Sequence, residues 1–425
     1  MDYRIILHKT LKGRVCMNRL QKHLSFVCFL IFIVCAVPSL ATDSEDAFNK
    51  KIDYYIRAMP SKVANSPSSR QIATYLLANA PSDERSRAYA AFQYVSAYFH
   101  PLPQEGITQT DCLGHSLLFK AICTAMGLKA EVIGGHDRKV EGGLPSECSH
   151  SWNAVKINGE WGLVECTWDP AKCEGGQVIR TPNAYNFLTP AKEFLCTHIP
   201  NDSKWQLMNP PLKDSEIDDL LFASSPYFAT GLKARAGSNA PVLKGETNIK
   251  VSFDNPKHIG MSAELWENNI KLASRLTFCQ SEGNISTVLV VFPHAGKYVL
   301  KVITNSIHRN DWFDQTINYS LLASGGVGAN AGFPETLEKF SKSGALLSSP
   351  DSYYLRGGNT PFSISVPDAT TVAILYNGQI FTLYREGQIF KGTVNIPPGS
   401  GQVTIAARFI GEGTFYFALV NYYVR

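Results

Sequence analysis

A cysteine, a histidine and two acidic residues stand along the chain in the order that thiol-based acyl transfer uses. Cys112 comes first, His150 follows it, and Glu165 and Asp169 come next. A thiolate attacks amide carbonyls readily when an imidazole takes the thiol proton, and an acid that hydrogen-bonds the imidazole holds it in the productive orientation. The sequence therefore predicts Cys112 as nucleophile, His150 as general base and Glu165 or Asp169 as the orienting acid.

The segment that begins at Cys112 has the pattern of a helix. Apolar residues recur at three- and four-residue steps as far as Met126, and Gly127 follows where a helix would end. The first turn of a helix has unpaired N–H groups and the positive end of the helix dipole, so a thiolate forms there more easily. Thr110 or Asp111 can cap this turn. The competing interpretation of Cys112 is a buried structural cysteine.

His150 falls on a predicted β-hairpin. Strand-like runs lie on either side of Asn158-Gly159, and Asn-Gly is the strongest two-residue hairpin signal. The register of such a turn places Trp152 opposite Glu165 and His150 opposite Thr167. These side chains then share one face of the ribbon, where Trp152 can form a wall beside the imidazole. The competing interpretation of His150 is an ordinary strand histidine.

Both acidic candidates are diagonal neighbours of His150 in this register. Their backbones lie roughly 7–8 Å from that of His150, a gap that a carboxylate side chain can close. Asp169 precedes Pro170 at the end of a strand, where it is better suited to capping a turn. Glu165 is therefore the preferred acid, and Asp169 is the alternative.

Taken in order, these residues resemble the transglutaminase-like superfamily of papain-type fold, and within it the kyphoscoliosis-peptidase-like group. The resemblance covers about residues 85–200, and its main matching positions are Cys112, Gly114, His115, Ser116, Met126, Gly127, Gly134, His150, Trp152, Asn153, Trp161 and Thr167. The family usually has aspartate where this chain has Glu165. The resemblance implies that Glu165 is the third catalytic residue.

The resemblance also implies a reaction on protein amide or peptide bonds through a thioester. Water as the acceptor would make the enzyme a cysteine peptidase or a deamidase, and an amine would make it a transglutaminase. The alternative to an enzyme is a catalytically inactive transglutaminase-like protein that serves as a protein-binding scaffold. We predict no cofactor and no metal, because His, Cys and acidic residues do not recur at metal-ligand spacing.

The N-terminus has the pattern of a signal peptide. Basic residues precede an apolar run from Leu24 to Val37, and Ser39-Leu40-Ala41 follows. The run is shorter than the ~20 residues that a spanning helix needs. We expect cleavage after Ala41 and a secreted or otherwise extracytoplasmic protein with no integral membrane segment left. A membrane anchor is the alternative.

Composition and patterning predict several domains. The chain has 425 residues, of which 44% are hydrophobic and 18% charged, and its net charge of +4 comes without a basic block that would indicate nucleic acid. We predict an α+β fold, in which a papain-like transglutaminase core precedes two immunoglobulin-like β-sandwich modules that bind or position another protein. The predicted boundaries are a signal peptide at 1–41, a thiol domain at 44–211, a β-sandwich at 212–323, a Gly-rich linker at 324–332 and a second β-sandwich at 333–425.

The cysteines suggest a disulfide. Three of the ten precede Ala41, and the odd number left is typical of one free thiol plus disulfides in an oxidising compartment. The hairpin register puts Cys148 opposite Asp169, so Cys173 need only double back to reach it. We predict a Cys148–Cys173 bond, which would contribute about 3 kcal/mol. The competing pair is Cys173 with Cys196.

Overall fold

The computed structural model describes most of the chain after the N-terminal segment. The residues described are 50–64, 66, 68–80, 82–97, 112–138, 150–168, 171–174, 177–180, 182–305, 313–328, 330–350 and 352–425. The predicted signal peptide, Asp111, Cys148 and Asp169 lie outside them.

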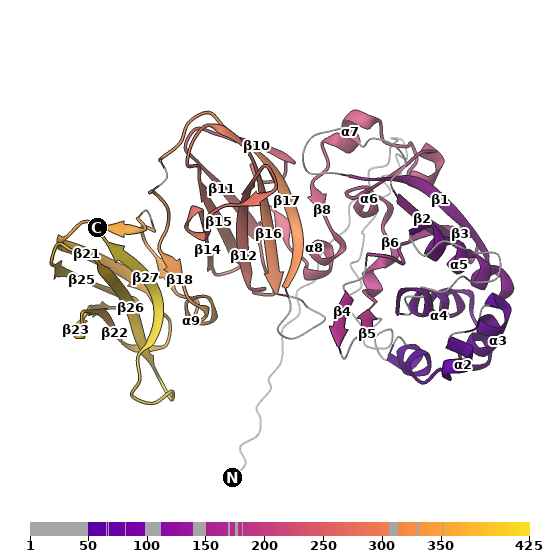
Figure 1. Ribbon diagram of the computed structural model, residues 1–425, viewed down its shortest axis with the longest axis horizontal. Helices are drawn as coiled ribbons and strands as arrows, with labels where there is room; N and C mark the ends of the chain where they lie inside the picture. The colour runs from indigo at the N-terminus through magenta and orange to yellow at the C-terminus, as the bar shows by residue number, and fades with distance from the viewer. Residues whose placement is uncertain are drawn as a thin grey trace, which may run out of the picture. The chain divides into compact units, whose positions relative to one another are not determined.

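The first described part is helical (Figure 1). Residues 50–57 form a helix, and four more follow: α2 (Ser61–Ala64), α3 (Ser69–Asn79), α4 (Glu84–Ala97) and α5 (Cys112–Ala125). The helices α3, α4 and α5 contact one another. Helix α4 is largely buried, and its side chains Ala88, Ala91, Phe92 and Val95 are fully so. The prediction that a helix begins at Cys112 is confirmed.

A five-stranded antiparallel sheet accompanies these helices. Its order is β6-β3-β2-β1-β7, and its strands are β1 (Lys129–Asp137), β2 (His150–Ile157), β3 (Glu160–Val164), β6 (Phe187–Thr189) and β7 (His198–Pro200). Helix α5 packs against β1 and β2. Gly127, with φ of 79°, makes the short turn between α5 and β1. The start of α5 therefore lies at the same end of the sheet as the end of β1 and the start of β2.

The hairpin of β2 and β3 has the predicted turn and register. Asn158 and Gly159 have φ of 51° and 92°, as a mirror-image two-residue turn requires. Pairing runs from Ile157 opposite Glu160 to Asn153 opposite Val164. The expectation that the second strand continues to residue 169 is wrong, because β3 ends at Val164. The next N–H, that of Glu165, donates instead to Asn186 O at 2.9 Å.

The stretch after the hairpin contains short strands and short helices. These are β4 (Ala171–Glu174) paired with β5 (Gln177–Arg180), then the 3₁₀ turn η1 (Ala184–Asn186), β6 and α6 (Ala191–Phe194). The 3₁₀ turn η2 (Ser203–Gln206) follows β7.

The next part is a two-sheet β structure introduced by α7 (Asp214–Asp218) and α8 (Ser225–Thr230). One sheet has the order β10-β17-β16-β12-β13, with β8 on β17, and the other has the order β14-β15-β11-β9. Tyr298 is buried and its hydroxyl donates to His294 O at 2.8 Å, which is the bond of a tyrosine corner. The strands are β8 (Phe222–Ala223), β9 (Lys233–Ala234), β10 (Val242–Gly245), β11 (Asn248–Asp254), β12 (Met261–Glu267), β13 (Ile270–Lys271), β14 (Thr277–Glu282), β15 (Ile285–Val291), β16 (Gly296–Asn305) and β17 (Phe313–Ala323), with the turn η3 (Ser274–Leu276).

The last part repeats the two-sheet plan. Its sheets have the orders β18-β27-β26-β22-β23, with β20 on β27, and β19-β21-β25-β24. The elements are β18 (Glu335–Thr336), α9 (Glu338–Lys342), β19 (Leu346–Leu347), β20 (Tyr354–Leu355), β21 (Gly358–Ser365), β22 (Ala369–Tyr376), β23 (Gln379–Thr382), β24 (Tyr384–Glu386), β25 (Ile389–Ile396), β26 (Gly401–Phe409) and β27 (Phe417–Val424). Alternate residues of these strands fill one apolar core.

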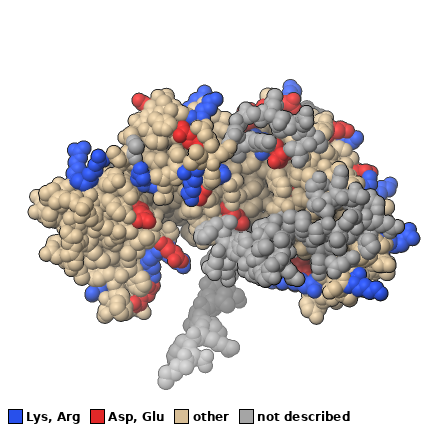
Figure 2. Space-filling model, in the orientation of Figure 1, with Lys and Arg blue, Asp and Glu red and all other residues tan. Residues whose placement is uncertain are grey.

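Two surface properties bear on partners. Among the residues described, none of the helices has the length and apolar character needed to cross a membrane. On the face drawn in Figure 2, basic and acidic side chains are interspersed among other residues.

Candidate active site

Cys112 is the first residue of α5 and is partly exposed. By contrast, Cys123 on the same helix is fully buried, and burial raises the pKa of its thiol far above the usual range. Of these two cysteines, only Cys112 has both the exposure and the helix-start position that favour a reactive thiolate.

Asn153 ties the cysteine helix to the histidine strand. Its side-chain N–H₂ donates to Ser116 O of α5 at 2.9 Å and to Glu131 O of β1 at 3.1 Å. Ser116 lies one turn after Cys112, and Asn153 lies three residues after His150. Since Asn153 is fully buried, water does not compete for these bonds. The tether fixes the start of α5 relative to the start of β2.

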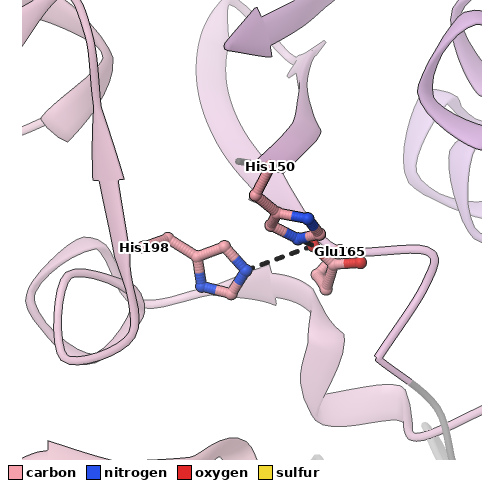
Figure 3. A group of neighbouring side chains, drawn as sticks. All are labelled: His150, Glu165 and His198. Atoms are coloured by element: carbon pink, nitrogen blue, oxygen red, sulfur yellow. Dashed lines mark hydrogen bonds and ion pairs between the residues drawn. The ribbon is translucent and has the colours of Figure 1, made fainter. Parts of the chain in front are cut away.

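His150 and Glu165 form a buried pair (Figure 3). His150 Nε2 lies 2.8 Å from Glu165 Oε2. Burial alone would lower the pKa of His150, but the hydrogen bond and charge of Glu165, with the charge of Asp137, raise it above its ordinary value. The structure thus brings together the predicted base and the preferred acid, and it leaves Nδ1 as the ring nitrogen not engaged by Glu165.

Four donors surround the Glu165 carboxylate. Oε1 accepts from the Thr167 hydroxyl and from the Thr167 N–H, the latter at 2.5 Å, and both imidazoles reach Oε2. Burial raises the pKa of this carboxyl, but the hydrogen bonds and charges of His150 and His198 outweigh burial and hold the pKa well below its usual range. Glu165 is therefore an anion in a buried site.

His198 is the member of the site that sequence reasoning missed. It begins β7, pairs in register with Asp137 of β1, and places Nε2 3.2 Å from Glu165 Oε2 (Figure 3). Burial lowers the pKa of His198, although Glu165 opposes the effect. No local motif marks His198, because its contact with Glu165 depends on β1 lying between β2 and β7. A search for buried histidines near the acid would have needed the sheet order.

Aromatic rings enclose the two imidazoles. Trp152, 1% exposed, lies with its ring 5.9 Å from that of His150, as predicted for a wall residue. Trp168 stacks on His150 at 5.2 Å and approaches His198 at 4.3 Å, and Phe194 stacks on His198 at 4.0 Å. Trp168 is 40% exposed and covers the site on its solvent side. The enclosure strengthens the hydrogen bonds inside it.

The same three polar groups could hold a metal ion. The ligand atoms of His150, Glu165 and His198 lie within 4.8 Å of one another, and zinc accepts two imidazoles and a carboxylate. Binding would require both Nε2 atoms to lose their protons and the present hydrogen bonds to break. The arrangement as it stands satisfies these atoms with one another.

The remaining predicted site residues have separate outcomes. The alternative acid Asp169, Cys148 and the side chain of Cys173 lie outside the described residues, so the Cys148–Cys173 bond stays a prediction. Cys196 is a buried thiol outside any disulfide, and its S–H donates to Lys192 O at 3.6 Å. The competing Cys173–Cys196 pair is therefore wrong. Burial raises the pKa of the Cys196 thiol to about 11.

Comparison with known families identifies the part that follows the site. Residues 215–325 match the family described as "KY-like, immunoglobulin-like domain". This range contains the two sheets from β8 to β17. An immunoglobulin-like β-sandwich of the KY-like kind is thus shown for this part of the chain.

Three curated relatives point to the same group. Kyphoscoliosis peptidase of Mus musculus is 26% identical over 136 residues, covering 29% of this chain and 20% of that protein. Hillarin of Drosophila melanogaster is 27% identical over 225 residues, or 45% and 27% of the two chains. Lim and transglutaminase domain protein ltd-1 of Caenorhabditis elegans is 29% identical over 136 residues, or 28% and 18%. The chain spans less than a third of the length of each relative, and it is similar to kyphoscoliosis-peptidase-like proteins.

Proposed function

We propose that this chain is a transglutaminase-like thiol enzyme with a papain-type core, in which Cys112, His150 and Glu165 act on amide or peptide bonds of a protein substrate. The observation that carries the proposal is the buried His150–Glu165 pair, 2.8 Å apart, at the end of the sheet where the cysteine helix begins. The relatives named for a peptidase and for a transglutaminase domain support it.

The proposed reaction starts with the Cys112 thiol. Nδ1 of His150 takes the thiol proton, while Glu165 holds Nε2 and stabilises the imidazolium that forms. The thiolate attacks the carbonyl carbon, and the Cys112 N–H at the helix start is one donor for the oxyanion. The C–N bond then breaks, the leaving amine or ammonia takes the proton from His150, and a thioester remains on Cys112.

The acceptor of the acyl group sets the reaction class. Attack by water releases an acid and makes the enzyme a peptidase or deamidase, whereas attack by an amine makes it a transglutaminase. In either case His150 removes a proton from the acceptor, and the thiol is regenerated. We further propose that the protein acts outside the cytoplasm and that its β-modules bind the substrate or another protein.

The test uses the full chain with a glutamine-containing protein such as casein. Three products are followed: fluorescent amine incorporated into casein, ammonia released and peptide bonds cleaved. Cys112→Ala should abolish whichever product the wild type makes, because the thioester cannot form. The control is Cys279→Ala, which removes a thiol on β14, a strand of the first β-sandwich. Turnover retained in Cys112→Ala would overturn the proposal.

The scaffold alternative predicts something different. A protein that only binds would make none of the three products, and its Cys112 would react with alkylating agents like an ordinary thiol. A glutamate at position 165, where the family usually has aspartate, is the main argument for a scaffold. That reason is weaker now that the longer carboxylate is seen to reach His150 with good hydrogen-bond geometry.

A further inference from the structure

A second buried imidazole contacts the same carboxylate oxygen as the base. His198 Nε2 lies 3.2 Å from Glu165 Oε2, and His150 Nε2 lies 2.8 Å from that oxygen. The two rings are 5.2 Å apart, and their side chains are 3% and 7% exposed. The catalytic scheme above gives His198 no task, although burying an imidazole is costly unless its polar atoms are paired.

His198 is itself held from several directions. Its Nδ1 lies 2.8 Å from the Thr197 hydroxyl, whose other acceptor, Phe194 O, is farther away at 3.4 Å. When the hydroxyl donates to Nδ1, the ring proton of the neutral imidazole lies on Nε2. Phe194 stacks on one side of the ring at 4.0 Å, and Trp152 meets it edge-on at 5.1 Å. Pairing of β7 with β1 fixes the backbone. These contacts therefore hold the ring so that its Nε2–H points at Glu165.

We propose that His198 is a positioning residue, which holds the Glu165 carboxylate against His150 and so orients the imidazole that serves Cys112. Thr167 holds Oε1, the other carboxylate oxygen, by two hydrogen bonds. Only His198 and His150 reach Oε2 among the bonds of the described residues. With Oε1 fixed by Thr167 and Oε2 by His198, the carboxylate plane is set independently of His150. A glutamate has three side-chain torsions to fix, so such support matters more for it than for a shorter acid.

The charges of the site fit this role. Burial keeps the pKa of His198 below its ordinary value, whereas Glu165 raises that of His150. Near neutral pH, His198 donates one N–H as a neutral ring and places no second cation beside the His150 imidazolium. It can therefore hold the carboxylate without competing for its charge.

The inference rests on the proposed function, and a matched pair of variants tests it. His198→Gln keeps an N–H donor at the same number of bonds from Cα as Nε2, whereas His198→Met has similar size and no donor. Both lose the ring contacts with Phe194 and Trp152 equally. The measurement is the rate at which iodoacetamide alkylates Cys112 in the full chain, followed by peptide mass mapping between about pH 5 and 9.

Loss of a hydrogen bond to a charged group should matter only in the Met variant. We expect His198→Met to alkylate about tenfold more slowly near neutral pH, with its pH profile moved toward that of an ordinary thiol. His198→Gln should stay near the wild type, while both variants lose thermal stability to a similar extent. If His198→Met does not fold, His198→Phe, which keeps an aromatic ring without a donor, should give the same slow alkylation.

Two other outcomes would overturn the inference and are distinguishable from failure of the proposed function. If alkylation of Cys112 slows equally in His198→Gln and His198→Met, or slows in neither, His198 only fills space. In that case wild-type Cys112 would still be alkylated at pH values below the pKa of an ordinary thiol. A wild-type Cys112 with the pH profile of an ordinary thiol would instead remove the proposed function, and this inference with it.

Discussion

Glu165 keeps a negative charge in a nearly dry environment because four donors from Thr167, His150 and His198 point at its two oxygens. A buried carboxylate without such donors would take up a proton. The carboxylate in turn raises the pKa of His150. At the scale of single residues, the pKa of the His150 imidazole is therefore set by a carboxylate that is itself held by its neighbours.

Glu165→Gln should lower the pKa of His150. The amide can still accept a hydrogen bond, but the negative charge that opposes burial is gone. Histidine ring resonances followed by NMR through a pH titration would report the change directly. Glu131→Gln is the control, since Glu131 pairs with Lys120 at the surface. An unchanged His150 pKa in Glu165→Gln would show that Glu165 does not set it.

Stability should depend on pH through the same carboxylate. The folded pKa of Glu165 is depressed, so its contribution is fully present above the unfolded value, about 4.3, and is lost as pH falls toward the folded pKa. Urea unfolding at a series of acidic pH values should show a steeper loss in the wild type than in Glu165→Gln. Parallel curves for the two proteins would contradict this linkage.

The sequence predicted His150 and Glu165 as partners but not how they meet. The Asn158-Gly159 turn fixed the register near the loop, from which the pair could be inferred. The pairing of β2 with β3 stops at Val164. The side chain of Glu165, the residue after β3 ends, then makes the contact with His150. His198 could not be inferred, because its place depends on a distant strand pairing across β1.

At the scale of elements, the small size of Gly135 lets β2, which carries His150, and β7, which carries His198, pack closely on either side of β1. Gly135 pairs with His150 on one side and with Pro200 on the other. A Cβ atom built on Gly135 would lie 2.3 Å from the Trp152 ring and 2.3 Å from Ile199 O. The indole therefore occupies the space that any other residue would need.

Gly135→Ala should destabilise the protein by about 1–3 kcal/mol, because both neighbours are tightly packed and one is backbone. Chemical denaturation measures the change, and Cys112 alkylation should slow as the histidine strands shift. The control is Gly162→Ala on β3, where the added Cβ would meet only the flexible end of Leu188, at 2.5 Å. An equal loss of unfolding free energy in the two variants would argue against a special packing constraint at Gly135.

At the scale of the whole molecule, Arg138 links the end of β1 to the segment before the first β-sandwich. Its guanidinium donates to Leu220 O at 2.9 Å, to Cys196 O at 3.1 Å and to Leu221 O at 3.3 Å. Cys196 also packs in the same apolar cluster as Ala223 and Tyr227. The two-sheet parts were predicted from short strand runs, but this junction was not, since it joins residues distant in sequence.

Arg138→Lys should loosen the junction, because an ammonium cannot reach several carbonyls in the planar arrangement that a guanidinium uses. We expect faster cleavage by a protease within residues 214–223, measured by limited proteolysis and mass mapping. Arg235→Lys is the matched control, since Arg235 pairs with Asp254 at an exposed site. Unchanged cleavage in Arg138→Lys would show that the junction does not depend on these bonds.

The central claim is that Cys112 is a nucleophile activated by His150, and the pH dependence of its alkylation tests this most directly. A thiolate at a helix start beside an imidazolium should react with iodoacetamide well below the ordinary thiol pKa of about 8.5. His150→Gln should remove that reactivity and restore an ordinary profile. Rapid alkylation of Cys112 near pH ~6 that disappears in His150→Gln is the result predicted. A wild-type profile with a midpoint near that of a free thiol, unchanged in His150→Gln, would contradict the account.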